Sequence, residues 1–182
     1  MNLLSHSHKP LSPDFTIRPF LEQDHTIVKQ FWLELDQHVL TRIADSARFV
    51  KNEQYPEFID RWLAQYQHNR NTLLLVGECE GRIAGFMVVH KQSQQWYRTD
   101  STGLIAVCFV HVLYRRRGLA TRMVNYARDW LLDEKVAYLD VVWDEGNTEA
   151  EKFWLAQGFK PAQTRAHQPL EKEPKRTDIK SK

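Results

Sequence analysis

The sequence is poor in cysteine and contains no long hydrophobic run. Its two cysteines, Cys79 and Cys108, both lie inside apolar stretches. Buried thiols of this kind favour a reducing compartment over a disulfide framework or a cysteine metal site. No apolar run approaches the length of a membrane span, and residues 1–12 are polar and histidine-rich rather than signal-like. We therefore expect a cytoplasmic protein with no membrane contact and no metal site.

The sequence also lacks a strong excess of charge, internal repeats and the length for two large cores. Its 25 Lys and Arg against 23 Asp and Glu give a net charge of +2, too little to imply a nucleic-acid partner. A chain of 182 residues has room for one sizeable core. We expect a flexible leader over residues 1–13, a single domain over 14–170 and a disordered tail over 171–182, where proline and alternating charges replace large apolar residues.

Four segments have the apolar spacing of amphipathic helices. Asp24 is a candidate cap for the first, Pro56 suits the first turn of the second, and Asn147 suits the cap of the fourth, which Gly158 ends. The predicted helices cover residues 24–38, 56–68, 119–134 and 147–158.

Short runs rich in apolar and β-branched residues predict the strands. Pro19 marks the first as an edge strand, and Glu80-Gly81 indicates a hairpin between two others. The predicted strands are Phe15–Pro19, Thr72–Cys79, Arg82–Lys91, Gly103–Val112, Ala137–Trp143 and Phe159 to about Gln168. The order predicts an α/β (α+β) fold with a mixed, mostly antiparallel sheet of six to seven strands and about four helices on its two faces. The unit from Gly103 to Val142 predicts a parallel crossover.

A basic turn joins the strand at Gly103 to the following helix. In it, Arg115, Gly118 and Ala120 are spaced so that glycine and a small residue let backbone come close to a ligand. Backbone N–H groups at the start of a helix favour phosphate, and neighbouring arginines add positive charge. Taken alone, the turn is equally compatible with a solvated basic loop. A single triplet of arginines with no basic stripe elsewhere is weak support for nucleic-acid binding.

At this turn the chain resembles the GNAT superfamily of N-acetyltransferases, whose acetyl-CoA signature is Arg/Gln-x-x-Gly-x-Gly/Ala between a strand and a helix. Arg115, Gly118 and Ala120 meet that signature. A second block is similar to the family's motif after the fifth strand. It consists of Asn147, Ala150, Phe153, Trp154, Gly158 and Phe159. The element order agrees as well, so the resemblance covers about residues 14–170.

The resemblance implies a GNAT-like sheet whose fourth and fifth strands splay apart around acetyl-CoA. Val110 and Val112 are then expected beside the pantetheine arm, with Asn147 reaching it and Phe153 packing nearby. The amides that are expected to hold the pyrophosphate belong to Arg115, Arg116, Arg117, Gly118, Leu119 and Ala120. The implied reaction is acetyl transfer to a primary amine by direct attack in a ternary complex. Dimers are common in such folds, and the sequence leaves a homodimer open.

The catalytic residues are less clearly marked than the cofactor residues. Trp154 stands where many family members have a tyrosine that protonates the departing thiolate, and an indole cannot replace it. His111 and Asp140 are candidate acid–base groups, although a structural histidine and a solvent-facing carboxylate are the plainer interpretations. Cys108 is interpreted as a core thiol. The Trp154 substitution also leaves open a non-catalytic acyl-CoA-binding or regulatory domain.

The resemblance places the acceptor site between the first two helices and the C-terminal segment, over about residues 36–55 and 160–170. The charges there conflict, because Asp36 favours a cationic amine whereas Arg42 and Arg48 favour an acidic one. The acceptor therefore stays open among a small molecule, a peptide N-terminus and a lysine side chain.

Overall fold

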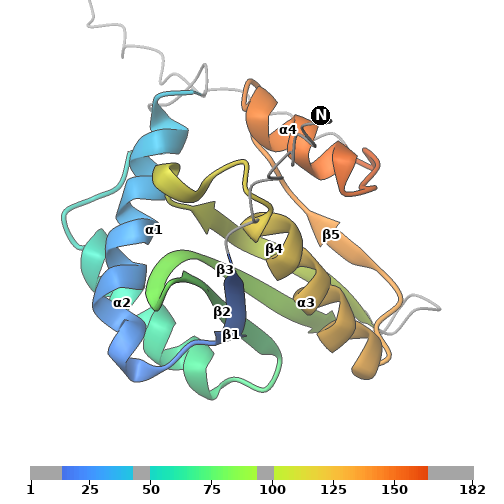
Figure 1. Cartoon of the computed structure of the whole chain (residues 1–182), viewed down its shortest axis with the longest axis horizontal. Coiled ribbons are helices and arrows are strands. Elements are labelled where there is room, and N and C mark those ends of the chain that lie inside the picture. Colours follow the sequence, from blue (N-terminus) through green and yellow to red (C-terminus); the bar gives the residue numbers. More distant parts are fainter. Residues whose placement is uncertain (1–13, 43–49, 94–100, 164–182) are drawn as a thin grey trace, which may run out of the picture.

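The computed structural model describes residues 14–42, 50–93 and 101–163. Its centre is a mixed sheet of five strands in the order β1-β2-β3-β4-β5 (Figure 1). The neighbouring strands are antiparallel except for β4 and β5, which are parallel. The strands are β1 (Phe15–Pro19), β2 (Thr72–Cys79), β3 (Arg82–Ser93), β4 (Ser101–Val110) and β5 (Leu139–Val141).

The helices cover both faces of the sheet, as the sequence predicted. Helices α1 (His25–Leu40) and α2 (Tyr55–His68) lie on one face. Helices α3 (Leu119–Asp133) and α4 (Thr148–Ala156) lie on the other (Figure 1). Two short 3-10 turns complete the described elements, η1 (Glu22–Asp24) before α1 and η3 (Val112–Tyr114) after β4.

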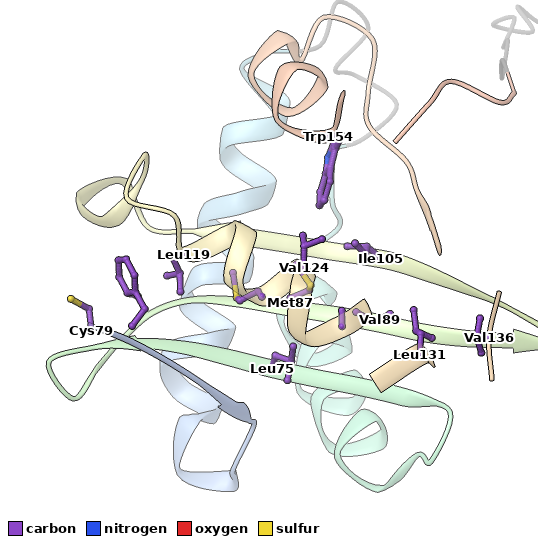
Figure 2. Close-up of a cluster of buried hydrophobic side chains, with 14 residues drawn as sticks. Leu75, Cys79, Met87, Val89, Ile105, Leu119, Val124, Leu131, Val136 and Trp154 are labelled. Atoms are coloured by element: carbon purple, nitrogen blue, oxygen red, sulfur yellow. The ribbon is translucent and has the colours of Figure 1, made fainter. Parts of the chain in front are cut away.

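Each face of the sheet has its own apolar core. The core under α3 and α4 is drawn in Figure 2, where Leu119, Val124 and Leu131 of α3 and Trp154 of α4 pack over Met87 and Ile105 of the central strands. The core under α1 and α2 joins Val28, Phe31 and Trp32 to the opposite faces of β2, β3 and β4. Strands β2 and β3 are therefore apolar on both faces, which explains their nearly continuous hydrophobic runs.

The predicted elements are confirmed, with corrections at several boundaries. The hairpin at Glu80-Gly81 and the edge strand β1 lie where they were expected. The strand predicted to reach Val112 ends at Val110, because the chain turns into η3 there and Val112 is 65% exposed. The strand predicted over Ala137–Trp143 is only Leu139–Val141, since β4 offers it three partners.

The sheet has fewer strands than expected among the described residues. Residues 159–163 of the predicted last strand are not in a strand, and the rest of that segment lies outside the described residues. The expected leader over residues 1–13 and tail over 171–182 also lie outside them. In the part of the chain that the structure describes, no helix combines the length and hydrophobicity of a membrane span.

The sequence predicted Asp24 as the cap of the first helix, but its side chain makes no capping hydrogen bond. It links the start of α1 to the sheet instead. Its carboxylate receives two hydrogen bonds from the Arg18 guanidinium, at 2.6 and 2.9 Å, and one from the Leu21 amide at 2.8 Å. Arg18 also donates to Glu78 on β2. Burial acts to raise the pKa of Asp24, but the bonds from Arg18 and Leu21 outweigh it and lower that pKa below its ordinary value.

Arg18→Met should destabilise the fold by leaving the buried Asp24 carboxylate, which is 3% exposed, without its cation. We expect a loss of about 2–3 kcal/mol in urea unfolding at pH 7, somewhat below the usual cost of breaking a fully buried pair. The matched control is Lys29→Met, which breaks the more exposed Lys29–Asp60 pair and should cost under about 1 kcal/mol. The Arg18 effect should fade as the pH falls below 3.8, the ordinary pKa of Asp24, because protonation removes the buried charge. Equal losses in the two variants would contradict this assignment.

Candidate functional site

The strands β4 and β5 separate partway along β4. They pair at Gly103–Leu139, Leu104–Asp140 and Ile105–Val141, and no further pair follows among the described residues. The next residue of β4, Ala106, has no partner on β3 either, because the register of that pair shifts there. Such a β-bulge bends a strand and ends its pairing. From Ala106 to Val110, the edge of β4 that faces β5 therefore has no strand partner, and the two strands diverge there (Figure 1). We refer to this divergence as the opening between β4 and β5.

The turn between β4 and α3 has the backbone of an anion site. Arg116 and Gly118 adopt positive φ angles of 62° and 90°. Gly118 precedes the first helical residue, and the first helical hydrogen bond is donated by Arg122 to the Gly118 carbonyl at 3.1 Å. The amides of the residues between them lack a partner within the helix, so they present N–H groups at the positive end of the helix dipole.

The side chains around this turn leave its outer face open. Arg116, Arg117 and Gly118 are exposed, whereas the Leu119 side chain is 1% exposed and anchors α3 in the core. A Cβ placed on Gly118 would meet no atom within 4 Å. The site therefore combines a fixed helix start with room for a ligand above it.

Arg115 supports the turn instead of extending from it. Its Nε donates to the Val110 carbonyl at 2.8 Å, and its guanidinium lies 5.9 Å from the Phe109 ring centroid. The side chain thus ties the turn back to the end of β4. Of the predicted anion-binding arginines, Arg116 and Arg117 are the two whose side chains are exposed.

The second predicted motif begins α4. The Asn147 side chain accepts a hydrogen bond from the Ala150 amide at 3.2 Å, so the predicted helix cap is confirmed. Gly158 has a φ of 88°, which confirms the predicted left-handed end of this helix. Between them, Phe153 packs edge-on against Trp154 at 4.8 Å between ring centroids.

Trp154 is a core residue. It is 5% exposed, stacks edge-on against Phe159 at 5.5 Å, and reaches from α4 toward β4 (Figure 2). An aromatic side chain held in this way positions α4 beside the opening. Since an indole donates a hydrogen bond but does not release its proton near neutral pH, Trp154 brings no acid to the site.

The two candidate acid–base residues occupy different surroundings. The His111 ring stacks on Phe31 of α1, at 5.4 Å and 20° between planes, and lies 6.1 Å from the Tyr114 ring. Its amide donates to the Ala84 carbonyl. Asp140 is exposed on β5 opposite Leu104, where β4 and β5 are still paired. The structure does not bring these two residues together.

The sequence analysis named Arg42 as a charge near the acceptor site but missed its pairing with Glu149 and the nearby His38. Arg42, which follows α1, forms an ion pair with Glu149 of α4 at 3.1 Å. His38 lies near this pair and near Arg115, whose charges act on its pKa. No sequence signal could have joined them, because a pair separated by about a hundred residues depends on the packing of α1 across the sheet.

Cys108 lies on the same half of β4 but is not a nucleophile. Burial raises the pKa of its thiol to about 12, so it is protonated at neutral pH. Among the residues with described positions, no group of His, Cys, Asp and Glu side chains could hold a metal ion. The arrangement is thus an opening lined by backbone, next to a helix start that favours an anion.

Comparison with known proteins identifies the family. The model of the acetyltransferase (GNAT) family matches residues 31–159, which include both motifs. The chain therefore belongs to the GNAT acetyltransferase family. A search of curated protein sequences returns no match.

Solved structures agree with the fold at low sequence identity. A GCN5-related N-acetyltransferase from Ralstonia eutropha is 17% identical, with a TM-score of 0.68 over 86% of this chain and 99% of that one. An aminoglycoside 6′-N-acetyltransferase from Acinetobacter haemolyticus is 13% identical, with a TM-score of 0.67 over 87% and 99%. An acetyltransferase from Clostridium acetobutylicum, solved with acetyl-CoA, is 13% identical, with a TM-score of 0.65 over 86% and 97%. At these identities the likeness concerns the fold.

Because its pKa is about 12, the Cys108 thiol should resist alkylation in the native protein. At pH 8 only about one thiol in 10,000 is ionised at that pKa, so iodoacetamide should leave Cys108 unmodified for hours. Mass spectrometry of the labelled peptides provides the measurement. The control is the urea-unfolded chain, in which Cys79 and Cys108 should both react. Rapid labelling of native Cys108 would contradict the raised pKa of its thiol.

Proposed function

We propose that this protein transfers the acetyl group of acetyl-CoA to a primary amine. The observation that carries the proposal is the adjacency of two backbone features on one segment. Strand β4 loses its β5 partner after Ile105, and the same strand leads into the left-handed Gly118 turn that starts α3. A slender pantetheine arm and a pyrophosphate fit these two features in that order. Family membership and the Clostridium structure solved with acetyl-CoA support the same cosubstrate.

In the proposed complex, the cofactor lies along residues of three elements. The proposed contacts of the pantetheine arm are Val110 at the end of β4, Val112 in η3, Asn147 at the cap of α4 and Phe153 within α4. The pyrophosphate lies over the turn, held by the amides of Arg115, Arg116, Arg117, Gly118, Leu119 and Ala120. The exposed side chains of Arg116 and Arg117 add charge at the same place.

The proposed reaction is direct attack of the amine on the thioester carbonyl. The N–C bond forms and the C–S bond breaks, while the amine loses a proton and the thiolate gains one. The protonated thiol of Cys108 argues against an acyl-enzyme on β4. His111 and Asp140 stay proposed proton acceptors. With a buried tryptophan at position 154, the thiolate takes its proton from water or from the amine.

The acceptor is proposed only as a primary amine. Three of the similar structures are aminoglycoside acetyltransferases, and one of them was solved with a bisubstrate analogue joining CoA to an acetylneamine. In this chain, the Asp36 carboxylate on α1 lies 3.6 Å from the Lys51 ammonium and next to the Tyr55 hydroxyl, so it is already engaged by neighbouring side chains. A small molecule, a peptide N-terminus and a lysine side chain remain the candidate classes.

A second function is favoured by Trp154 alone. A domain that keeps the acyl-CoA site but lacks the usual acid would bind acyl-CoA without turnover and serve as a sensor or regulator. Because CoA thiolate is a fairly good leaving group, absence of the acid does not by itself prevent transfer, and we favour the enzyme.

Thiol release from acetyl-CoA distinguishes the two functions. We expect release above the hydrolysis background with at least one amine from a panel containing a diamine, a polyamine, an aminoglycoside, a free dipeptide and a blocked lysine. Mass spectrometry should show a product 42 Da heavier than the amine, the mass that acetylation adds. Binding of acetyl-CoA without release across the panel would favour the non-catalytic domain instead.

Gly118→Asp tests the position of the pyrophosphate. The new carboxylate would stand in the open space above the turn and repel phosphate, so CoA affinity measured by calorimetry should fall at least about 100-fold. The matched control is Gly81→Asp at the β2–β3 hairpin, where φ is also positive, at 73°, and a Cβ also meets no atom within 4 Å. This control variant introduces a similar backbone strain at a position away from the proposed site. Equal CoA affinities in the two variants would disprove this placement.

A further inference from the structure

One face of α1 and the turn after it contact both the end of β4 and the start of α4. Phe31, Leu35 and His38 follow one another at intervals of four and three residues, so they share that face, and Arg42 lies two residues beyond the end of the helix. At the first of these positions, Phe31 packs against Phe109 at 5.3 Å between ring centroids and against His111 at 5.4 Å. This end of the face therefore rests on the end of β4.

The turn that follows this face contacts the start of α4. Arg42 pairs with Glu149 at 3.1 Å, and a Cβ placed on Gly146 would lie 3.1 Å from the Arg42 carbonyl oxygen. Eleven residues separate Phe31 from Arg42, a span of about 16 Å along a helix. The chain from Phe31 to Arg42 therefore runs from the end of β4 to the start of α4.

His38 lies between these two contacts, four residues before Arg42 and seven after Phe31. It is half-buried, and burial is the largest cause that lowers the pKa of its imidazole. Three charges act on it, from the turn after β4, from the turn after α1 and from α4. Arg115 of the turn and Arg42 lower its pKa further, whereas Glu149 of α4 raises it. His38 is therefore neutral at pH 7 and able to accept a proton.

We infer that His38 is the catalytic base that accepts the proton of the acceptor amine at the opening between β4 and β5. This assignment rests on the proposed acetyl transfer. An ammonium group gives one proton to the His38 imidazole, and the neutral amine then attacks the thioester carbonyl. As the C–S bond breaks, the second proton leaves the nitrogen and neutralises the CoA thiolate. The imidazolium returns its proton to water, so the balance is one proton released for each acetyl group transferred.

The geometry favours His38 over the two candidates that the sequence supplied. The His111 ring is stacked on Phe31 and flanked by Tyr114, which holds it as a packing residue at the end of β4. Asp140 lies where β4 and β5 are still paired, before the opening begins. Of the three, only His38 lies between the contact of α1 with the end of β4 and the contact of the following turn with α4.

The kinetic test compares His38→Gln with the wild type, using the amine that the thiol-release panel identifies. We expect kcat/KM for the amine to fall about 100-fold at pH 7, with acetyl-CoA affinity by calorimetry unchanged. The deficit should shrink toward pH 9.5, where more of the amine is already neutral. The matched control is His68→Gln, which alters an exposed histidine at the end of α2 and should have no effect. A deficit that is absent, or the same at every pH, would overturn the assignment.

A second measurement tests the placement without turnover. In protein labelled with 15N-histidine, the His38 imidazole signal is identified by its loss in His38→Gln. Saturation with acetyl-CoA should move this signal and leave the His68 signal in place. An unmoved His38 signal in a protein that binds acetyl-CoA would overturn the inference. Absence of turnover in the wild type, with a His38 signal that moves, would instead contradict the proposed transfer and leave the placement supported.

Discussion

Hydrogen bonding between β4 and β5 lasts for only three residue pairs, and the features of the candidate site follow from where it stops. The bulge at Ala106 follows the last pair directly and turns the carboxyl half of β4 away from β5. Without that separation, β5 would cover the edge that borders the opening, and α4 would have no place beside it. If β4 and β5 paired for one more residue, the unpaired edge of β4 would be one residue shorter, because the last pair marks where that edge begins.

The separation of the strands costs backbone hydrogen bonds, and packing on both faces of the sheet offsets them. On one face, Trp154 fixes α4 over the core that Leu119 anchors at the start of α3. On the other face, Phe31 holds α1 against the end of β4. The Arg42–Glu149 pair then joins the turn after α1 to helix α4. The buried aromatic side chains of Phe31 and Trp154 hold the helices in place on the two faces, and the exposed Arg42–Glu149 pair adds little to the stability of the fold.

Local signals in the sequence predicted the parts of this structure that local chemistry determines. The Glu80-Gly81 hairpin, the Asn147 cap and the left-handed Gly158 depend on a few neighbouring residues, and each lies where it was expected. Strand ends were less predictable. Apolar spacing carried the predicted strand on to Val112, although the chain leaves the sheet two residues earlier. A strand end depends on its partners, and the short β5 shows the same limit.

Roles that depend on distant residues could not be predicted from the sequence. Asp24 has the sequence position of a helix cap, but Arg18 on β1 recruits its carboxylate, because a guanidinium offers two hydrogen bonds and a charge. His38 is one of eight histidines, and nothing adjacent to it distinguishes it. Its proximity to Arg115 and Glu149 depends on how α1 packs against the sheet, which no local sequence pattern specifies.

We propose that acetyl-CoA lies along the half of β4 that β5 does not pair with, and that its pyrophosphate lies at the start of α3. Amide hydrogen exchange with and without acetyl-CoA tests it most directly. We predict slower exchange at residues 106–110 and 115–120 on binding, with the β2–β3 hairpin around Gly81 unchanged. Binding that leaves both of those segments unprotected, and slows exchange elsewhere, would contradict the account.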